Sequence, residues 1–97
     1  MYASVRTYRN VARAGEVRAL VERDLVPRLR RLPGFVAYHL FHAADRMTAV
    51  SLFDTEAGAA ESARLAVAWG GENLAGFYAG EPEVTGREMF VALADAA

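Results

Sequence analysis

The chain has 97 residues and a formal net charge of −1, with 54% hydrophobic and 24% charged residues. This composition is typical of one globular domain over residues 1–97 and excludes a disordered chain, and the net charge gives no bulk attraction to nucleic acid or to an anionic membrane. The sequence has no cysteine, no signal-peptide region and no apolar run of membrane length, so we expect a cytoplasmic protein. Its eleven basic residues are all arginine, which indicates a GC-rich bacterial source.

The first third of the chain predicts a strand followed by a helix. Residues 2–9 mix aromatic, β-branched and polar residues, which is typical of a strand. From about Gly15 to Leu32 the apolar residues recur at helical spacing, which predicts an amphipathic helix. Pro27 should kink or restart this helix because it has no N–H to donate, and Pro33-Gly34 should end it.

The rest of the chain predicts a hairpin, a second helix and a last strand. Residues 35–42 and 47–53 read as two strands joined by a short turn. Asp54 or Thr55 can cap a helix that runs to about residue 71, and a short turn or helix at 74–78 follows. Residues 83–91 supply the last strand. The order βαββαβ predicts an α+β, ferredoxin-like fold with two helices on one face of a four-stranded antiparallel sheet.

The middle strands are apolar on both faces, which predicts a partner chain. Alternation places two mostly apolar sets on opposite sides of the second strand, namely Phe35, Ala37, His39 and Phe41 against Val36, Tyr38, Leu40 and His42. The third strand divides into Met47, Ala49, Ser51 and Phe53 against Thr48, Val50 and Leu52. Because the helices cover only one face, we expect a homodimer formed through the sheet. The alternative is a monomer with an exposed apolar face.

Three short features carry a resemblance to a known family. They are Leu32-Pro33-Gly34-Phe35 after the first helix, Val50-Ser51-Leu52-Phe53-Asp54 before the second, and Trp69 within the second. In these features and in element order the chain resembles the antibiotic biosynthesis monooxygenase-like proteins of the dimeric α/β-barrel superfamily. The resemblance implies a dimer whose sheets form a barrel, with a pocket between sheet and helices in each subunit. Some members oxidise polyketide-like aromatic molecules with molecular oxygen and no cofactor.

The resemblance also implies roles for particular residues. Trp69 and Arg87 correspond to pocket residues of members that oxidise quinone-forming phenols, and Tyr78 is a looser counterpart. The family's helical asparagine one turn before the tryptophan is Leu65 here, and Asn73 lies one turn after it. Haem-degrading relatives use a helical histidine, and this chain has no histidine after residue 42. The resemblance therefore implies a cofactor-independent oxygenase rather than a haem enzyme.

The residues themselves support a pocket on the inner side of the second helix. Helical spacing aims Ser62, Trp69 and Asn73 at one face among small residues. An indole offers a flat stacking surface and one N–H donor, although a lone tryptophan can equally fill a core. Arg87 could stabilise an enolate or phenolate, or could be a strand-surface or interface arginine. Tyr8, Tyr38 and Tyr78 are mainly packing residues, and any of them could place a hydroxyl in the pocket.

The histidines do not indicate a metal site. His39 and His42 lie three apart on a strand and therefore point to opposite faces, and no carboxylates cluster beside them. His39 could act as a general base toward a phenolic proton, or could be a hydrogen-bonded structural residue. The sequence contains no phosphate loop, zinc spacing or nucleophile elbow.

Three functions compete at this point. The first is a cofactor-free monooxygenase for a small aromatic or polyketide-type molecule, with Trp69, Arg87 and His39 as catalytic candidates and Ser62, Asn73, Tyr78 and Tyr8 as ligand-binding candidates. The second is a non-catalytic small-ligand-binding or accessory dimer. The third, an RNA-recognition module, shares the element order, but residues 47–54 lack the basic-Gly-aromatic start of an RNP1 pattern and the net charge is negative, so we reject it.

Overall fold

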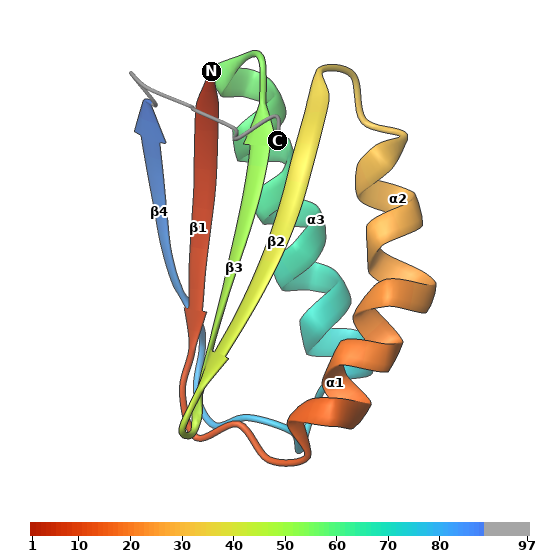
Figure 1. Cartoon of the computed structure of the whole chain (residues 1–97), viewed down its shortest axis with the longest axis vertical. Helices are drawn as coiled ribbons and strands as arrows, with labels where there is room; N and C mark the ends of the chain where they lie inside the picture. The colour runs from red at the N-terminus through yellow and green to blue at the C-terminus, as the bar shows by residue number, and fades with distance from the viewer. Residues whose placement is uncertain (89–97) are drawn as a thin grey trace, which may run out of the picture.

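The computed structural model describes residues 1–88, apart from the side chain of Arg87. The elements in chain order are β1 (Tyr2–Tyr8), α1 (Ala14–Leu20), the π-helical segment η1 (Val21–Leu25), α2 (Val26–Arg30), β2 (Phe35–Ala43), β3 (Arg46–Phe53), α3 (Glu56–Asn73) and β4 (Glu83–Glu88). The strands form one antiparallel sheet in the order β2-β3-β1-β4. The helices lie on one face of this sheet (Figure 1), which confirms the ferredoxin-like prediction.

α1, η1 and α2 form one continuous helical rod with a wide turn near its middle. The N–H of Val26 donates to the carbonyl of Val21, five residues back, so the turn is π-helical. Pro27 follows this turn directly and stands in the first turn of α2. Pro27 has no N–H to donate, and the helix widens to a π-helical turn just before it. This wide turn takes the place of the expected kink. The rod ends at Arg30, two residues earlier than predicted.

A β-bulge at the start of β2 changes the expected alternation. The register with β3 shifts between Phe35 and Ala37, so Phe35 stands opposite Phe53 on the helix-facing side. Val36, the extra residue, is 46% exposed. The prediction that Phe35 shares a face with Ala37 and Phe41 was therefore wrong, because strict alternation assumes a regular ladder.

The two strings that suggested a family meet in space. Asp54 donates its backbone N–H to the carbonyl of Gly34 over 2.9 Å. The rings of Phe35 and Phe53 pack edge to face with centroids 5.7 Å apart. Gly34 has a φ of +83°, and a Cβ there would overlap the carboxylate of Asp54. This junction fixes the start of β2 against the end of β3.

Only approximate ends of the second helix could be predicted from the sequence. Thr55, rather than Asp54, is its N-cap, because the Thr55 hydroxyl accepts the N–H of Gly58 over 3.1 Å. α3 continues to Asn73, about two residues further than expected. Residues 74–78 then form a turn closed by a bridge between Ala75 and Tyr78, not a helix. Residues 89–91 of the predicted last strand lie outside the described residues.

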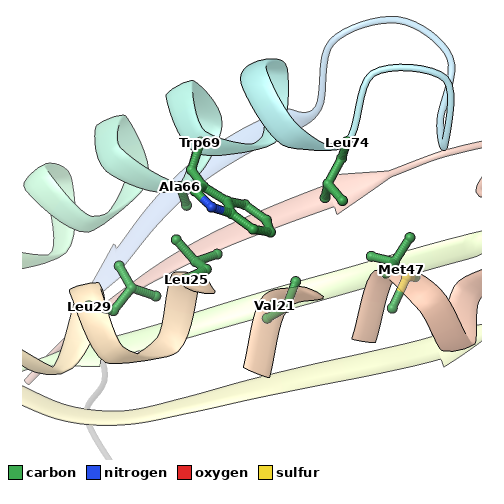
Figure 2. Close-up of a cluster of buried hydrophobic side chains, with 8 residues drawn as sticks. Val21, Leu25, Leu29, Met47, Ala66, Trp69 and Leu74 are labelled. Carbon is green, nitrogen blue, oxygen red and sulfur yellow. The ribbon is translucent and has the colours of Figure 1, made fainter. Parts of the chain in front are cut away.

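The core lies between the helical rod, α3 and the sheet (Figure 2). Its buried members are Val17, Val21, Leu25, Leu29, Met47, Ala66, Trp69 and Leu74. The other sheet face is covered by no helix within residues 1–88 (Figure 1). It carries Val5, Val50, Leu52 and Phe41, and Phe41 is 58% exposed. None of the helices among the described residues is both long and apolar enough to cross a membrane.

Candidate functional site

β1 directs its more polar face toward the helices. Its register with β3 places Tyr2, Ser4, Arg6 and Tyr8 opposite Phe53, Ser51, Ala49 and Met47, which form the buried side of β3. Ala3, Val5 and Thr7 occupy the outer face. An arginine is thereby carried into the space between sheet and helices, where it has 0% exposure.

Arg6 is held in this space by neutral partners. One terminal nitrogen donates to the hydroxyl of Ser4 over 2.9 Å and the other to the hydroxyl of Ser51 over 3.0 Å. The Nε–H is buried and has no hydrogen-bond partner in the part of the chain that the structure describes. No acidic side chain of residues 1–88 forms an ion pair with Arg6, since the ion pairs found there involve other arginines. Because arginine does not lose its proton, Arg6 is a buried positive charge that no acidic side chain of residues 1–88 compensates.

Arg6 lines a small internal cavity together with aromatic side chains. The cavity has a volume of about 20 Å³, and its wall includes Tyr8, Tyr38, Trp69 and Tyr78. This is space for about one water molecule. Trp69 is only 3% exposed, and its indole extends from α3 into the region between the two helices, near Leu25 and Val21 (Figure 2). The remaining wall is apolar.

The three tyrosines of the cavity wall keep their protons at neutral pH. Burial raises the pKa of Tyr8 and of Tyr38, and the nearby Arg6 guanidinium opposes the rise in both. Burial also raises the pKa of Tyr78, with smaller contributions in the same direction from Tyr8 and Glu81. The rings of Tyr8 and Tyr78 meet edge to face with centroids 4.9 Å apart. The cavity therefore has neutral hydroxyl donors beside one fixed cation.

Tyr78 is positioned by α3 and by the loop after β1. A Cβ on Gly70 would lie 3.0 Å from the Tyr78 hydroxyl, so a glycine lets this hydroxyl approach the helix closely. The neighbouring Phe77 carbonyl accepts the N–H of Ala12 over 2.7 Å. The guanidinium of Arg13 lies 4.3 Å from the centre of the Phe77 ring. These contacts hold the turn that brings Tyr78 to Tyr8.

An open groove adjoins the cavity. It lies between the helical rod and β2, and its volume of about 720 Å³ is in the range of small-molecule sites. Four residues, Val21, Tyr38, Leu40 and Met47, line both the groove and the cavity. One layer of side chains therefore separates a ligand-sized groove from Arg6 and Trp69.

The structure brings three of the predicted site residues together and leaves two others apart. Trp69, Tyr8 and Tyr78 share the cavity wall. Ser62 is fully buried, but its hydroxyl donates to the carbonyl of Ala59 in its own helix over 2.7 Å. Asn73 is exposed, and its side-chain amide donates to the carbonyl of Trp69 over 2.9 Å. This hydrogen bond caps a backbone carbonyl in the last turn of α3.

Of the remaining two catalytic candidates, the structure describes the side chain of His39 alone. His39 lies on the outer sheet face, exposed and stacked on Phe41 with ring centres 6.3 Å apart. His42, on the opposite face, lines the groove instead. The backbone of Arg87 pairs with Ala3 in the β1–β4 ladder, but its side chain lies outside the described part of the structure.

Sequence reasoning missed Arg6 and gave Tyr38 only as a packing residue that could place a hydroxyl in the pocket. Alternation along residues 2–8 puts Arg6 on the same face as Tyr8, but an arginine on a strand is usually expected to face solvent. No group of three or more histidine, cysteine or acidic side chains that could hold a metal occurs among the described residues.

Comparison with known proteins identifies the fold. No protein-family model matches the chain, and no curated protein sequence matches it. Among solved structures, it is similar to the ActVA-Orf6 monooxygenase of Streptomyces coelicolor in complex with nanaomycin D, with a TM-score of 0.73 and 16% identity over 98% of this chain and 92% of that one.

Two further structures have the same arrangement. A dimeric ferredoxin-like protein from an uncultured marine organism has a TM-score of 0.71 and 11% identity, covering 97% of this chain and 98% of that one. An antibiotic biosynthesis monooxygenase has a TM-score of 0.63 and 15% identity, covering 94% and 100%. The chain therefore has the ferredoxin-like fold that these structures share.

Proposed function

We propose that the chain is a cofactor-independent monooxygenase-like enzyme for a small aromatic or polyketide-type molecule. The observation that carries the proposal is the aromatic cavity wall of Tyr8, Tyr38, Trp69 and Tyr78, one side-chain layer from an open groove of about 720 Å³. A flat ligand lying in the groove would contact Tyr38, which lines both the groove and the cavity, and could receive a hydrogen bond from its neutral phenol. The similarity in fold to a monooxygenase bound to nanaomycin D supports the same ligand class.

The proposed reaction is the oxidation of an activated CH2 group to a carbonyl. Loss of a proton gives a carbanion stabilised by the ligand's own aromatic system. This carbanion reduces O2 and forms a new C–O bond. The resulting hydroperoxide loses water, so that CH2 and O2 become C=O and H2O. The protein's contribution is to bind and orient the ligand and to exclude solvent.

Oxygen consumption with an anthrone tests this function. We expect Trp69→Phe, which removes the indole N–H and part of the cavity wall, to lower turnover by about 10²-fold. Arg64→Gln is the matched control, because Arg64 is an exposed residue of the same helix, paired with Glu61. Arg87→Gln and His39→Asn test the other two catalytic candidates, of which His39 lies on the outer face of the sheet. Wild-type turnover in Trp69→Phe would remove the indole from the mechanism.

A second function is a non-catalytic small-ligand-binding protein that uses the same groove. It is favoured by the absence of any histidine or carboxylate from the described cavity wall, which leaves no conventional base to accept a proton. Saturable binding of the anthrone without oxygen consumption by the wild-type protein would decide for this function.

Either function would be carried out by a homodimer. Val5, Val50, Leu52 and the 58% exposed Phe41 form an apolar surface on the outer face of the sheet. A second copy facing it about a two-fold axis would bury this surface in both chains. A dimeric ferredoxin-like protein of the same fold supports this arrangement.

A further inference from the structure

We propose that Arg6 is an anion-binding residue and that the ligand of the cavity carries a negatively charged oxygen. The proposal deepens the function above, since it rests on the same ligand pocket, but it does not require turnover. It starts from the charge of the site: Arg6 has 0% exposure, and no acidic partner is found for it within residues 1–88.

The neighbours of Arg6 stabilise its position without neutralising it. Ser4 and Ser51 accept one hydrogen bond each from the terminal nitrogens, and both are neutral. The nearby Tyr8 and Tyr38 are also neutral, because burial raises the pKa of each phenol. A positive charge surrounded only by neutral groups in an apolar interior gains most from an anion.

One donor of Arg6 remains available, and Arg6 borders the cavity. Nε of Arg6 is buried without a partner, and Arg6 lines the cavity whose wall also holds Trp69. An anionic oxygen in this cavity could accept the Nε–H and be approached by the neutral tyrosine hydroxyls. The cavity itself has room for only one or two atoms, so the body of the ligand must lie in the groove beyond Tyr38 and Leu40.

The chemical class of ligand follows from this geometry. It is a flat aromatic molecule with an ionised oxygen at one end, either a phenolate or enolate or a carboxylate. A neutral aromatic alcohol of the same size would fill the groove but leave the Arg6 charge uncompensated. The site should therefore select the ionised over the neutral form of one molecule.

4-Nitrophenol tests this selection directly, because its two forms differ in visible absorbance. Binding is followed by quenching of Trp69, the single tryptophan of the sequence. We expect the apparent pKa of the bound probe to lie at least one unit below that of the free probe, which corresponds to at least tenfold tighter binding of the anion. The neutral 4-nitrobenzyl alcohol should bind at least tenfold more weakly, and 4-nitrobenzoate shows whether a carboxylate can replace the phenolate.

Variants separate the Arg6 charge from the general charge of the protein. Arg6→Met should abolish the preference for the anion, while Arg9→Met, which removes an exposed arginine paired with Glu83, should leave it unchanged. Should Arg6→Met fail to fold by circular dichroism, Arg6→Lys keeps a charge without the Nε donor and should reduce the preference.

Equal binding of the neutral and ionised probes by the wild-type protein overturns the proposal, as does a complete lack of saturable quenching. Retention of the anion preference by a folded Arg6→Met protein overturns it too. Anion binding without oxygen consumption would preserve this inference and remove the proposed oxygenation.

Discussion

Alanine in place of Gly70 or Gly71 separates helix propensity from packing at the cavity. Both glycines lie in α3, and alanine gains roughly 0.8–1 kcal/mol over glycine inside a helix, somewhat less in the last turn. A Cβ at Gly71 meets nothing within 4 Å. We therefore expect Gly71→Ala to raise the free energy of unfolding by about 0.5–1 kcal/mol, or roughly 2–8 °C in Tm.

At Gly70 the same change meets the cavity wall. The new Cβ would lie 3.0 Å from the Tyr78 hydroxyl, whose ring already packs against Tyr8. Overpacking costs about 1–3 kcal/mol, so Gly70→Ala should be between neutral and about 2 kcal/mol destabilising. Urea unfolding followed by circular dichroism measures both variants. An equal gain at the two positions would show that Tyr78 is not held against α3 and would refute the packing described for the site.

Three other perturbations have clear outcomes. Gly34→Ala should lower the free energy of unfolding by more than about 2 kcal/mol in urea, because it forces a side chain to positive φ and into the Asp54 carboxylate. The raised pKa values of Tyr8 and Tyr38 mean that the folded state holds their protons more tightly than the unfolded chain. Stability should be fully present below about pH 10 and fall as the pH rises further, and this fall should be smaller in a protein with both residues changed to Phe. Phe41→Arg should convert the proposed dimer to a 10.5 kDa monomer by light scattering, and a monomeric wild-type protein would contradict the dimer.

The order and type of the elements could be predicted because each has a strong local pattern. Alternating apolar positions located the strands to within one or two residues, as in β3, expected at 47–53 and found at Arg46–Phe53. Irregularities could not be predicted in the same way. The bulge that turns Phe35 toward the helices and the π-helical turn before Pro27 depend on how neighbouring elements fit together, which periodicity does not record.

The site was predicted in part, for a related reason. Trp69 and Tyr78 were chosen from the family resemblance, Trp69 also from its position on the inner face of the second helix, and Tyr8 as a packing residue that could place a hydroxyl in the pocket; all three line the cavity. His39 was chosen for its chemistry alone, and its position in β2 directs its side chain to the outer face of the sheet. Arg6 was overlooked because an arginine is expected to be exposed to solvent, whereas the pairing of β1 with β3 directs its side chain to the interior.

The orientation of β1 links the proposed dimer to the proposed anion site. Hydrophobicity alone would turn Val5 toward the helices and Arg6 toward solvent, and a one-residue slip of the strand would achieve this. The observed register does the opposite, with Val5 facing outward beside Val50. In an isolated chain this arrangement exposes apolar surface and buries a charge, and both are unfavourable. It becomes favourable if a second copy covers Val5 and an anionic ligand neutralises Arg6. Dimerisation and anion binding are therefore expected to stabilise the same strand from its two faces.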